Sequence, residues 1–193
     1  MGVKHPNPKN AQPQGAYFTP PEATELLLKV EGFPKHVYEP ACGKGHISNV
    51  LLERGFSVIS SDLNDWGYGA TGVDFLTKVF VETDFEPKSS GLVTNPPFHL
   101  ADEFVLRAVE LGFKKIALFN KLSWLAGAKR YGTLWRNFPP DRVWILAKRA
   151  TCWRMDDPNP KSSGGSVDYM WAVWDNPVRK TGVAKAPSIG WLI

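Results

Sequence analysis

Residues 36–55, HVYEPACGKGHISNVLLERG, decide the fold that we expect for this chain. Residues 36–40 have the pattern of a short strand, and residues 46–55 have the pattern of a helix that Gly55 ends. Gly43 and Gly45 lie in the turn between them, where positive φ and an open backbone would let a ligand reach the helix N-terminus. A strand, a glycine turn and a helix in this order predict an α/β sheet.

Strand and helix patterns alternate through the first two thirds of the chain, and two apolar runs then follow with no helix between them. This order predicts a mostly parallel, seven-stranded sheet with helices on both faces and a C-terminal antiparallel hairpin. The first helix begins with Thr19 and Glu22 at the spacing of a capping box. The expected strands are 36–40, 56–63, 72–76, 91–94, 114–120, 142–148 and 167–174. The expected helices are 19–30, 46–55, 101–112 and a broken one at 129–138.

Composition indicates an ordinary globular protein. The chain has 193 residues, 43% of them hydrophobic, and a formal net charge of +4. We expect residues 1–16 to be a flexible arm and residues 17–193 to form a single domain. Two cysteines are too few for a disulfide framework or a zinc cluster, so we expect a cytoplasmic protein without a metal site. Since no apolar run approaches about 18 residues, we expect no membrane partner.

Three successive strand ends carry residues that suit a nucleoside. The glycine turn follows the first strand, Asp62 ends the second, and Asp74 and Phe75 lie at the end of the third. In such sheets ligands bind at the carboxyl ends of the strands, where Asp62 would accept hydrogen bonds from ribose hydroxyls. Asp74 would accept from an adenine amino group, and Phe75 would pack on the adenine ring. A plain turn, a strand-end cap and a core phenylalanine are the alternatives for the single positions.

The sequence Asn95-Pro96-Pro97-Phe98 follows the next expected strand. The Asn95 side-chain oxygen and the Pro96 carbonyl are two hydrogen-bond acceptors on a backbone that the prolines restrict. Two convergent acceptors suit a group with two hydrogens, such as an exocyclic amine, and would direct its lone pair towards an electrophile. Phe98 would stack on the ring that carries the amine. A rigid strand-to-helix turn is the structural alternative.

These motifs resemble those of class I S-adenosylmethionine-dependent amino-methyltransferases, specifically the members that carry (D/N/S)PP(Y/F/W). The glycine turn resembles their cofactor loop, and residues 17–21, YFTPP, resemble the N-terminal motif of the DNA adenine-N6 members. The chain as a whole resembles compact, phage-type enzymes of this branch. The resemblance implies a Rossmann-like methyltransferase domain that binds S-adenosylmethionine, with Asn95, Pro96, Pro97 and Phe98 as the catalytic residues. It implies cofactor contacts from Tyr17, Phe18, Thr19, Pro20, Glu39, Pro40, Ala41, Cys42, Gly43, Gly45, Asp62, Asp74 and Phe75.

The expected substrate is nucleic acid, with adenine N6 in DNA as the leading target. A duplex base would have to be flipped out of the stack. The substrate side would include Phe98, His99, Trp124, Lys129 and Arg130, although His99 could simply start a helix and Trp124 could be core. Basic residues between 129 and 154 could grip phosphates or form a solvated face. The chain has no room for a separate target-recognition domain, which favours relaxed specificity or a partner that supplies recognition.

Several functions remain open at this stage. The same motif serves cytosine N4, guanine N2 or adenine N6 in RNA, and glutamine amides of proteins. A nicotinamide-dependent oxidoreductase would use a similar sheet, but Ser48 replaces the third glycine of its fingerprint. A non-catalytic nucleic-acid-binding protein is the third alternative. The sequence does not determine the oligomeric state.

Overall fold

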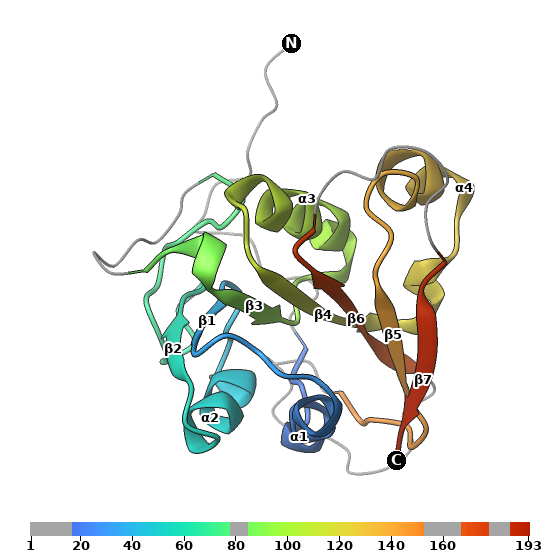
Figure 1. The fold of residues 1–193 in the computed structure, drawn as a ribbon. Helices are drawn as coiled ribbons and strands as arrows, with labels where there is room; N and C mark the ends of the chain where they lie inside the picture. The colour runs from blue at the N-terminus through green and yellow to red at the C-terminus, as the bar shows by residue number, and fades with distance from the viewer. Residues whose placement is uncertain (1–16, 78–84, 153–166, 178–185) are drawn as a thin grey trace.

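The structure is a computed structural model that describes residues 17–77, 85–152, 167–177 and 186–193. The proposed arm at residues 1–16 therefore lies outside the described residues. One seven-stranded sheet has the strand order β2-β1-β3-β4-β6-β5-β7 (Figure 1). Its strands are β1 (His36–Glu39), β2 (Ser57–Ser60), β3 (Gly91–Thr94), β4 (Lys115–Lys121), β5 (Arg142–Leu146), β6 (Tyr169–Asp175) and β7 (Ser188–Leu192).

The strand pairing confirms the predicted architecture. Strands β2, β1, β3 and β4 are parallel neighbours, whereas β6 is antiparallel to both β4 and β5. The predicted antiparallel hairpin is thus the β5–β6 pair. The chain continues beyond it to β7, which pairs in parallel with β5 and which the sequence analysis did not predict.

The expected strand at residues 72–76 is wrong. Only a single bridge joins Ser61 to Ala70 beyond the end of β2, and the chain then turns. Gly69 and Gly72 have φ of 68° and 72°, which interrupts an extended conformation. The Asp74 carboxylate then accepts a hydrogen bond from the Leu76 N–H at 3.0 Å, which forms a local turn in place of a sheet ladder.

Helices cover both faces of the sheet, as predicted. Helices α1 (Pro21–Val30) and α2 (His46–Glu53) lie on one face, and α3 (Ala101–Leu111) and the short α4 (Ala128–Arg130) lie on the other (Figure 1). A π-helical turn at Tyr131–Trp135 continues α4, which confirms the broken helix. Short 3₁₀ turns occupy Pro87–Ser89, Phe98–Leu100 and Leu122–Leu125.

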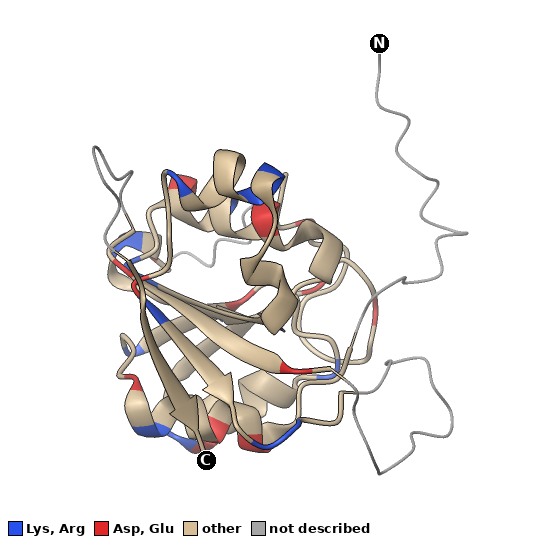
Figure 2. Ribbon diagram, turned by 90° about the vertical axis from the view of Figure 1, so that its right-hand side faces the viewer, with Lys and Arg blue, Asp and Glu red and all other residues tan. Residues whose placement is uncertain are grey.

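Alternating side chains divide the core into two layers. In β4, Ile116 and Leu118 pack with the α3 side, and Ala117 and Phe119 pack with α1 and α2. The strand β6 alternates in the same way, since successive side chains of a strand point to opposite faces. Figure 2 shows the consequence: the strands are almost entirely free of charge, and charged residues gather on helices and at strand ends.

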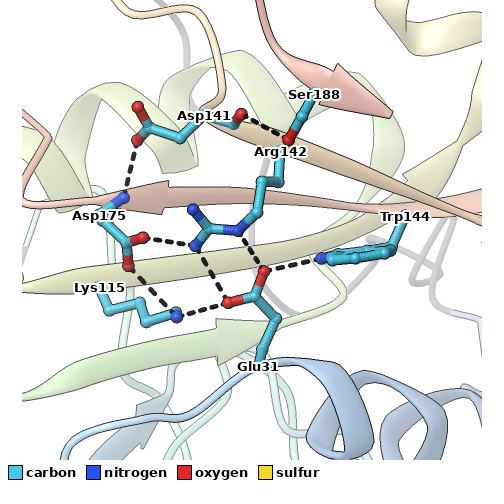
Figure 3. A network of polar contacts seen from close by, with 7 residues as sticks. All are labelled: Glu31, Lys115, Asp141, Arg142, Trp144, Asp175 and Ser188. Carbon is cyan, nitrogen blue, oxygen red and sulfur yellow. Dashed lines mark hydrogen bonds and ion pairs between the residues drawn. The ribbon is translucent and has the colours of Figure 1, made fainter. Parts of the chain in front are cut away.

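An ion-pair network ties α1 to the sheet at the end opposite the carboxyl ends of the parallel strands. Glu31 accepts hydrogen bonds from Arg142, from Lys115 at 2.6 Å and from the Trp144 indole at 2.7 Å (Figure 3). Asp175 pairs with the same two cations. The Glu31 side chain is 4% exposed, so these partners compensate a charge that has lost its water.

Among the described residues, no helix has the length and apolar character needed to cross a membrane.

Candidate active site

A pocket opens where the loops that follow β1, β2 and β3 meet. Eight predicted residues line it: Tyr17, Pro40, Ala41, Asp62, Asp74, Phe75, Asn95 and Pro97. Seven lining residues were not predicted: Leu63, Asn64, Trp66, Val73, Leu76, Leu100 and Phe104. Most of these seven residues lie within four positions after a predicted site residue. Their closeness in the sequence to the predicted residues could therefore have identified them. The fold therefore brings Asp62, Asp74, Phe75 and Asn95 to one pocket, whereas Gly43 and Gly45 of the glycine turn are not among its lining residues.

The glycine turn is held by the carboxylate of Asp62. Gly43 and Gly45 have φ of 52° and 81°, as the motif requires. The Gly43 N–H donates to Asp62 Oδ2 at 3.0 Å, and the Asn64 N–H donates to Oδ1 at 2.8 Å. Burial raises the pKa of Asp62, and these donors oppose that rise. The Trp66 and Asn64 side chains also hydrogen-bond to Asp62, so four donors share a carboxylate that offers about four acceptor positions.

Asp74 and Phe75 line the pocket from a turn and not from a strand end. One oxygen of the Asp74 carboxylate caps the Leu76 N–H, as described above. Phe75 is 2% exposed, and its ring centroid lies 5.9 Å from that of Tyr38 and 5.1 Å from that of Phe104. The Phe75 ring thus belongs to the core and forms part of the pocket wall.

Glu39 and Cys42, two further residues of the proposed cofactor loop, are also absent from the pocket lining. The Glu39 carboxylate is 1% exposed and accepts a hydrogen bond from the Ser48 hydroxyl in α2. Burial raises its pKa well above the usual value, and the bond from Ser48 opposes that rise. The Cys42 thiol is also buried and lies 3.6 Å from the Tyr68 carbonyl. Both residues shape the turn from inside.

The N-terminal motif packs over the glycine turn and the NPPF segment. The Phe18 ring meets the His46 imidazole edge-on, with centroids 3.8 Å apart. Phe18, Thr19 and Pro20 do not line the pocket. The predicted capping box is wrong, because the N-cap of α1 is Pro20 and no side chain caps it. The Thr19 hydroxyl instead accepts a hydrogen bond from Asn95.

The side-chain amide nitrogen of Asn95 makes hydrogen bonds, whereas its amide oxygen has no hydrogen-bond partner among the described residues. Its Nδ2 donates to Thr19 Oγ1 at 2.8 Å and to the Tyr17 carbonyl at 3.2 Å. Its Oδ1 is buried and has no hydrogen-bond partner among the described residues. A buried acceptor without a partner is costly, and such groups mark places where a ligand can bind.

Phe98 is surrounded by other side chains. Tyr17 stacks on it with ring centroids 5.2 Å apart and 22° between the planes. The Lys121 ammonium lies 4.7 Å from the Phe98 centroid, and Tyr169 lies on a further side at 6.2 Å. Stacking of a substrate ring on Phe98 would require Tyr17 to move. His99 begins no α-helix but lies exposed in the 3₁₀ turn before α3.

The structure places two of the proposed substrate residues in structural roles. Trp124 is 4% exposed, packs against Trp135 and donates its indole N–H to Asp102 at 2.7 Å, so it belongs to the core. Arg130 pairs with Asp102 at 2.7 Å and donates to the carbonyls of Trp124 and Ala126. Its guanidinium therefore holds the turn together. Lys129, in contrast, is exposed.

The basic stretch 129–154 is accordingly not one free cationic surface. Arg142 belongs to the Glu31 network, and Arg149 pairs with Asp168 at 3.3 Å. Arg154 lies outside the described residues. Among the described residues, no cluster of three or more His, Cys, Asp or Glu side chains could hold a metal ion.

No family model and no curated protein matches this sequence, but solved structures match its fold. A proposed RNA methyltransferase from Pyrococcus horikoshii aligns over 91% of this chain and 92% of its own, with a TM-score of 0.56 and 17% identity. A proposed class I S-adenosylmethionine-dependent methyltransferase from Listeria monocytogenes aligns over 89% of this chain and 62% of its own, with a TM-score of 0.54 and 10% identity.

A modification subunit of a proposed type I restriction enzyme from Vibrio vulnificus YJ016 aligns over 92% of this chain. Its TM-score is 0.53 at 14% identity, and this chain spans 46% of its length. At identities this low, the likeness concerns the fold alone. This chain has the Rossmann-like fold of class I S-adenosylmethionine-dependent methyltransferases.

Proposed function

We propose that this protein transfers a methyl group from S-adenosylmethionine to an exocyclic amine of a nucleic-acid base, with adenine N6 in DNA as the leading target. The observation that carries the proposal is the buried Oδ1 of Asn95, which has no partner among the described residues. It belongs to a residue that lines the strand-end pocket. An acceptor that lacks a donor calls for a ligand that brings one.

The chemistry of the two acceptors favours an amine as the methyl acceptor. Asn95 Oδ1 and the Pro96 carbonyl can only accept hydrogen bonds, and neither Pro96 nor Pro97 has an N–H to compete. An NH₂ group would donate one hydrogen to each oxygen, which directs its lone pair away from both. The protein thus acts by holding and polarising the amine and not by removing a proton first.

The pocket lining combines a carboxylate acceptor with apolar side chains, which a methyl-carrying nucleoside would need. Asp62 would accept from ribose hydroxyls in place of the Trp66 or Asn64 side chain, and the apolar wall contains Ala41, Val73 and Phe75. When bound, S-adenosylmethionine would supply the electrophilic methyl group. The residues of this chain would orient it beside Asn95 and exclude water from the apolar part of the pocket.

The choice of nucleic acid rests on the N-terminal motif and on two structural neighbours. Residues 17–21 resemble the DNA adenine branch more than the RNA and protein branches. One neighbour is described as an RNA methyltransferase and another as a modification subunit of a restriction enzyme. Exposed Lys129 and His99 are the described candidates for substrate contacts. RNA guanine N2, RNA adenine N6 and a protein glutamine amide are the alternative acceptors.

The test is incubation of the purified chain with methyl-labelled S-adenosylmethionine and separate pools of DNA, RNA and protein. We expect label in DNA, and nucleoside digestion should identify N6-methyladenine. Label confined to RNA or to glutamine would reject the DNA assignment. Calorimetry with S-adenosylmethionine and with NAD tests the cofactor separately, and tight binding of NAD alone would reject the methyltransferase proposal.

A further inference from the structure

We infer that the Thr19 hydroxyl and the Tyr17 carbonyl set the direction of the Asn95 side-chain amide, so that Thr19 is a positioning residue for methyl transfer. The inference rests on the proposed function and assigns Thr19 a role other than cofactor contact. It starts from one arrangement: Asn95 Nδ2 lies 2.8 Å from Thr19 Oγ1 and 3.2 Å from the Tyr17 carbonyl oxygen.

The Tyr17 carbonyl decides which amide atom of Asn95 faces the N-terminal segment. The nitrogen and oxygen of an amide have similar shapes, so their assignment has to follow from the hydrogen bonds. A backbone carbonyl can only accept, whereas a threonine hydroxyl can donate or accept. The group beside both must therefore be the NH₂ of Asn95. Both of its hydrogens are then used, and Oδ1 is left as the buried amide atom without a donor among the described residues.

The opposite orientation would defeat the proposed chemistry. If the amide turned by 180°, Oδ1 would face the Tyr17 carbonyl and repel it, and the NH₂ would face the substrate amine. Two donors would then oppose each other at the reacting centre. The contacts from residues 17 and 19 thus select the only amide orientation of Asn95 that accepts from an amine.

Proline pairs restrict the backbone on both sides of this contact. Thr19 precedes Pro20 and Pro21, and Asn95 precedes Pro96 and Pro97. A residue before proline is restricted to extended conformations, and proline fixes its own φ. The Thr19–Asn95 hydrogen bond therefore joins two stiff segments that are 76 residues apart in the sequence. This stiffness lets one neutral hydrogen bond orient a side chain with little reorganisation.

The Thr19 hydroxyl is buried and makes a hydrogen bond with Asn95. Thr19 is 3% exposed, and a buried hydroxyl without a partner is unfavourable. The hydroxyl does not cap α1, although its sequence position suggested that role. The hydroxyl instead accepts a hydrogen bond from Nδ2 of Asn95. The other amide atom of Asn95, Oδ1, has no partner among the described residues.

The experiment compares Thr19→Val, Thr19→Ser and Thr24→Val in the full chain. Valine keeps the shape of threonine and removes the hydroxyl, whereas serine keeps the hydroxyl. Thr24 is the matched control, because it is equally buried on the neighbouring helix and its hydroxyl has no partner. The readouts are kcat, KM for the nucleic acid, the dissociation constant of S-adenosylmethionine, and the Asn95 side-chain NH₂ resonances in NMR spectra.

For Thr19→Val we expect kcat to fall about tenfold, as loss of one orienting hydrogen bond implies, with cofactor affinity within about twofold of the wild type. The Asn95 NH₂ resonances should shift and exchange faster. Thr19→Ser should restore kcat and the resonances, and Thr24→Val should leave both unchanged. Equal losses of kcat for valine and serine, or a loss of cofactor affinity in proportion to kcat, would overturn the inference.

The NMR readout separates failure of this inference from failure of the proposed function. If the wild type methylates no amine, the proposed function fails, whatever the NMR spectra show. If the wild type is active but Thr19→Val leaves kcat and the Asn95 resonances unchanged, the positioning role of Thr19 fails alone. Unchanged Asn95 resonances in Thr19→Val would reject the hydrogen bond itself, with or without activity.

Discussion

Glu31 and Arg142 are joined by two hydrogen bonds although 111 residues separate them in the sequence. Glu31 lies directly after α1 and Arg142 begins β5, so the pair fastens the first helix to the far half of the sheet (Figure 3). Burial raises the pKa of Glu31, but hydrogen bonds from Arg142, Lys115 and Trp144 outweigh that effect and lower it overall. The carboxylate is therefore ionised in the folded protein at neutral pH.

Glu31→Gln should destabilise the fold by about 3 kcal/mol, because it leaves two cations to share Asp175. Urea unfolding at pH 7 measures the loss. The matched control is Glu110→Gln, which removes a salt bridge to Arg107 on the surface of α3 and should cost less than about 0.5 kcal/mol. Equal effects of the two substitutions would show that the buried network contributes no more than a surface pair.

His46 should titrate at unusually low pH. Burial and the neighbouring charge of Lys44 lower its pKa to about 4. Because the unfolded imidazole binds its proton near pH 6.5, this residue should reduce stability progressively as the pH falls from about 6.5 towards 4. NMR titration of the His46 ring protons measures the midpoint directly. A midpoint near 6.5 would mean that the ring is solvated.

Asn95→Ala should lower the rate of methyl transfer by about 100-fold or more, because it removes an acceptor aligned with the substrate amine. The affinity for S-adenosylmethionine should change by less than about threefold, since the proposal directs Oδ1 to the amine and not to the cofactor. Single-turnover kinetics and calorimetry measure the two quantities. Asn49→Ala, on the exposed side of α2, should keep full activity. Near-normal transfer by Asn95→Ala would contradict the amine-holding role.

Arg130→Ala should mainly reduce stability, whereas Lys129→Ala should mainly change nucleic-acid binding. Arg130→Ala removes the pair with Asp102 and two bonds to carbonyls, which should cost about 1–2 kcal/mol in urea unfolding. Lys129→Ala should leave stability unchanged. The logarithm of the DNA-binding constant falls linearly with the logarithm of the salt concentration. If Lys129 contacts a phosphate, its loss should make that slope shallower by about one unit. Fluorescence anisotropy at several salt concentrations measures that slope, and an unchanged slope would remove Lys129 from the interface.

Gly69→Ala should destabilise the protein more than Gly72→Ala. Both glycines have positive φ, of 68° and 72°. A Cβ at position 69 would lie 2.7 Å from the Ser60 carbonyl oxygen and 2.9 Å from Cys42 Sγ, whereas position 72 has open space. We expect about 1 kcal/mol for Gly72→Ala from backbone strain and about 2 kcal/mol more for Gly69→Ala. Thermal unfolding of both variants measures the difference in stability. Equal losses of stability would mean that the loop around Gly69 can shift to make room for the Cβ.

Local patterns were sufficient for most of the elements. Helices α2 and α3 end near Gly55 and Gly112, both with positive φ, as the sequence indicated. The strand predicted at 72–76 failed because glycine turns and the Asp74 cap compete with sheet pairing for the same backbone groups. The strand β7 was missed because its five residues contain Gly190 and show no regular alternation; pairing with β5 stabilises it.

In the candidate site, too, features set by neighbouring residues could be predicted, and features set by distant residues could not. The glycine turn, Asp62 and Asn95 could be predicted because each follows a strand, and strand ends of a parallel sheet meet at one edge. The sequence left Trp124 as either a substrate contact or a core residue, because the choice depends on Asp102 and Trp135 in other elements. The ion pair of Arg130 with Asp102 could not be predicted for the same reason, since a charge in the sequence does not reveal its partner.

The amino-acid sequence by itself determined most of the helices and strands, the positive-φ glycines and the acceptor-rich NPPF turn, because all of these depend on backbone preferences of neighbouring residues. Only the tertiary structure decided which polar atoms are satisfied. It paired Arg142 with Glu31 and turned the Asn95 amide so that Oδ1 is left without a protein donor. Hydrogen bonds between segments far apart in the chain depend on distances that only the packed sheet sets, and those distances determine which groups remain available for a ligand.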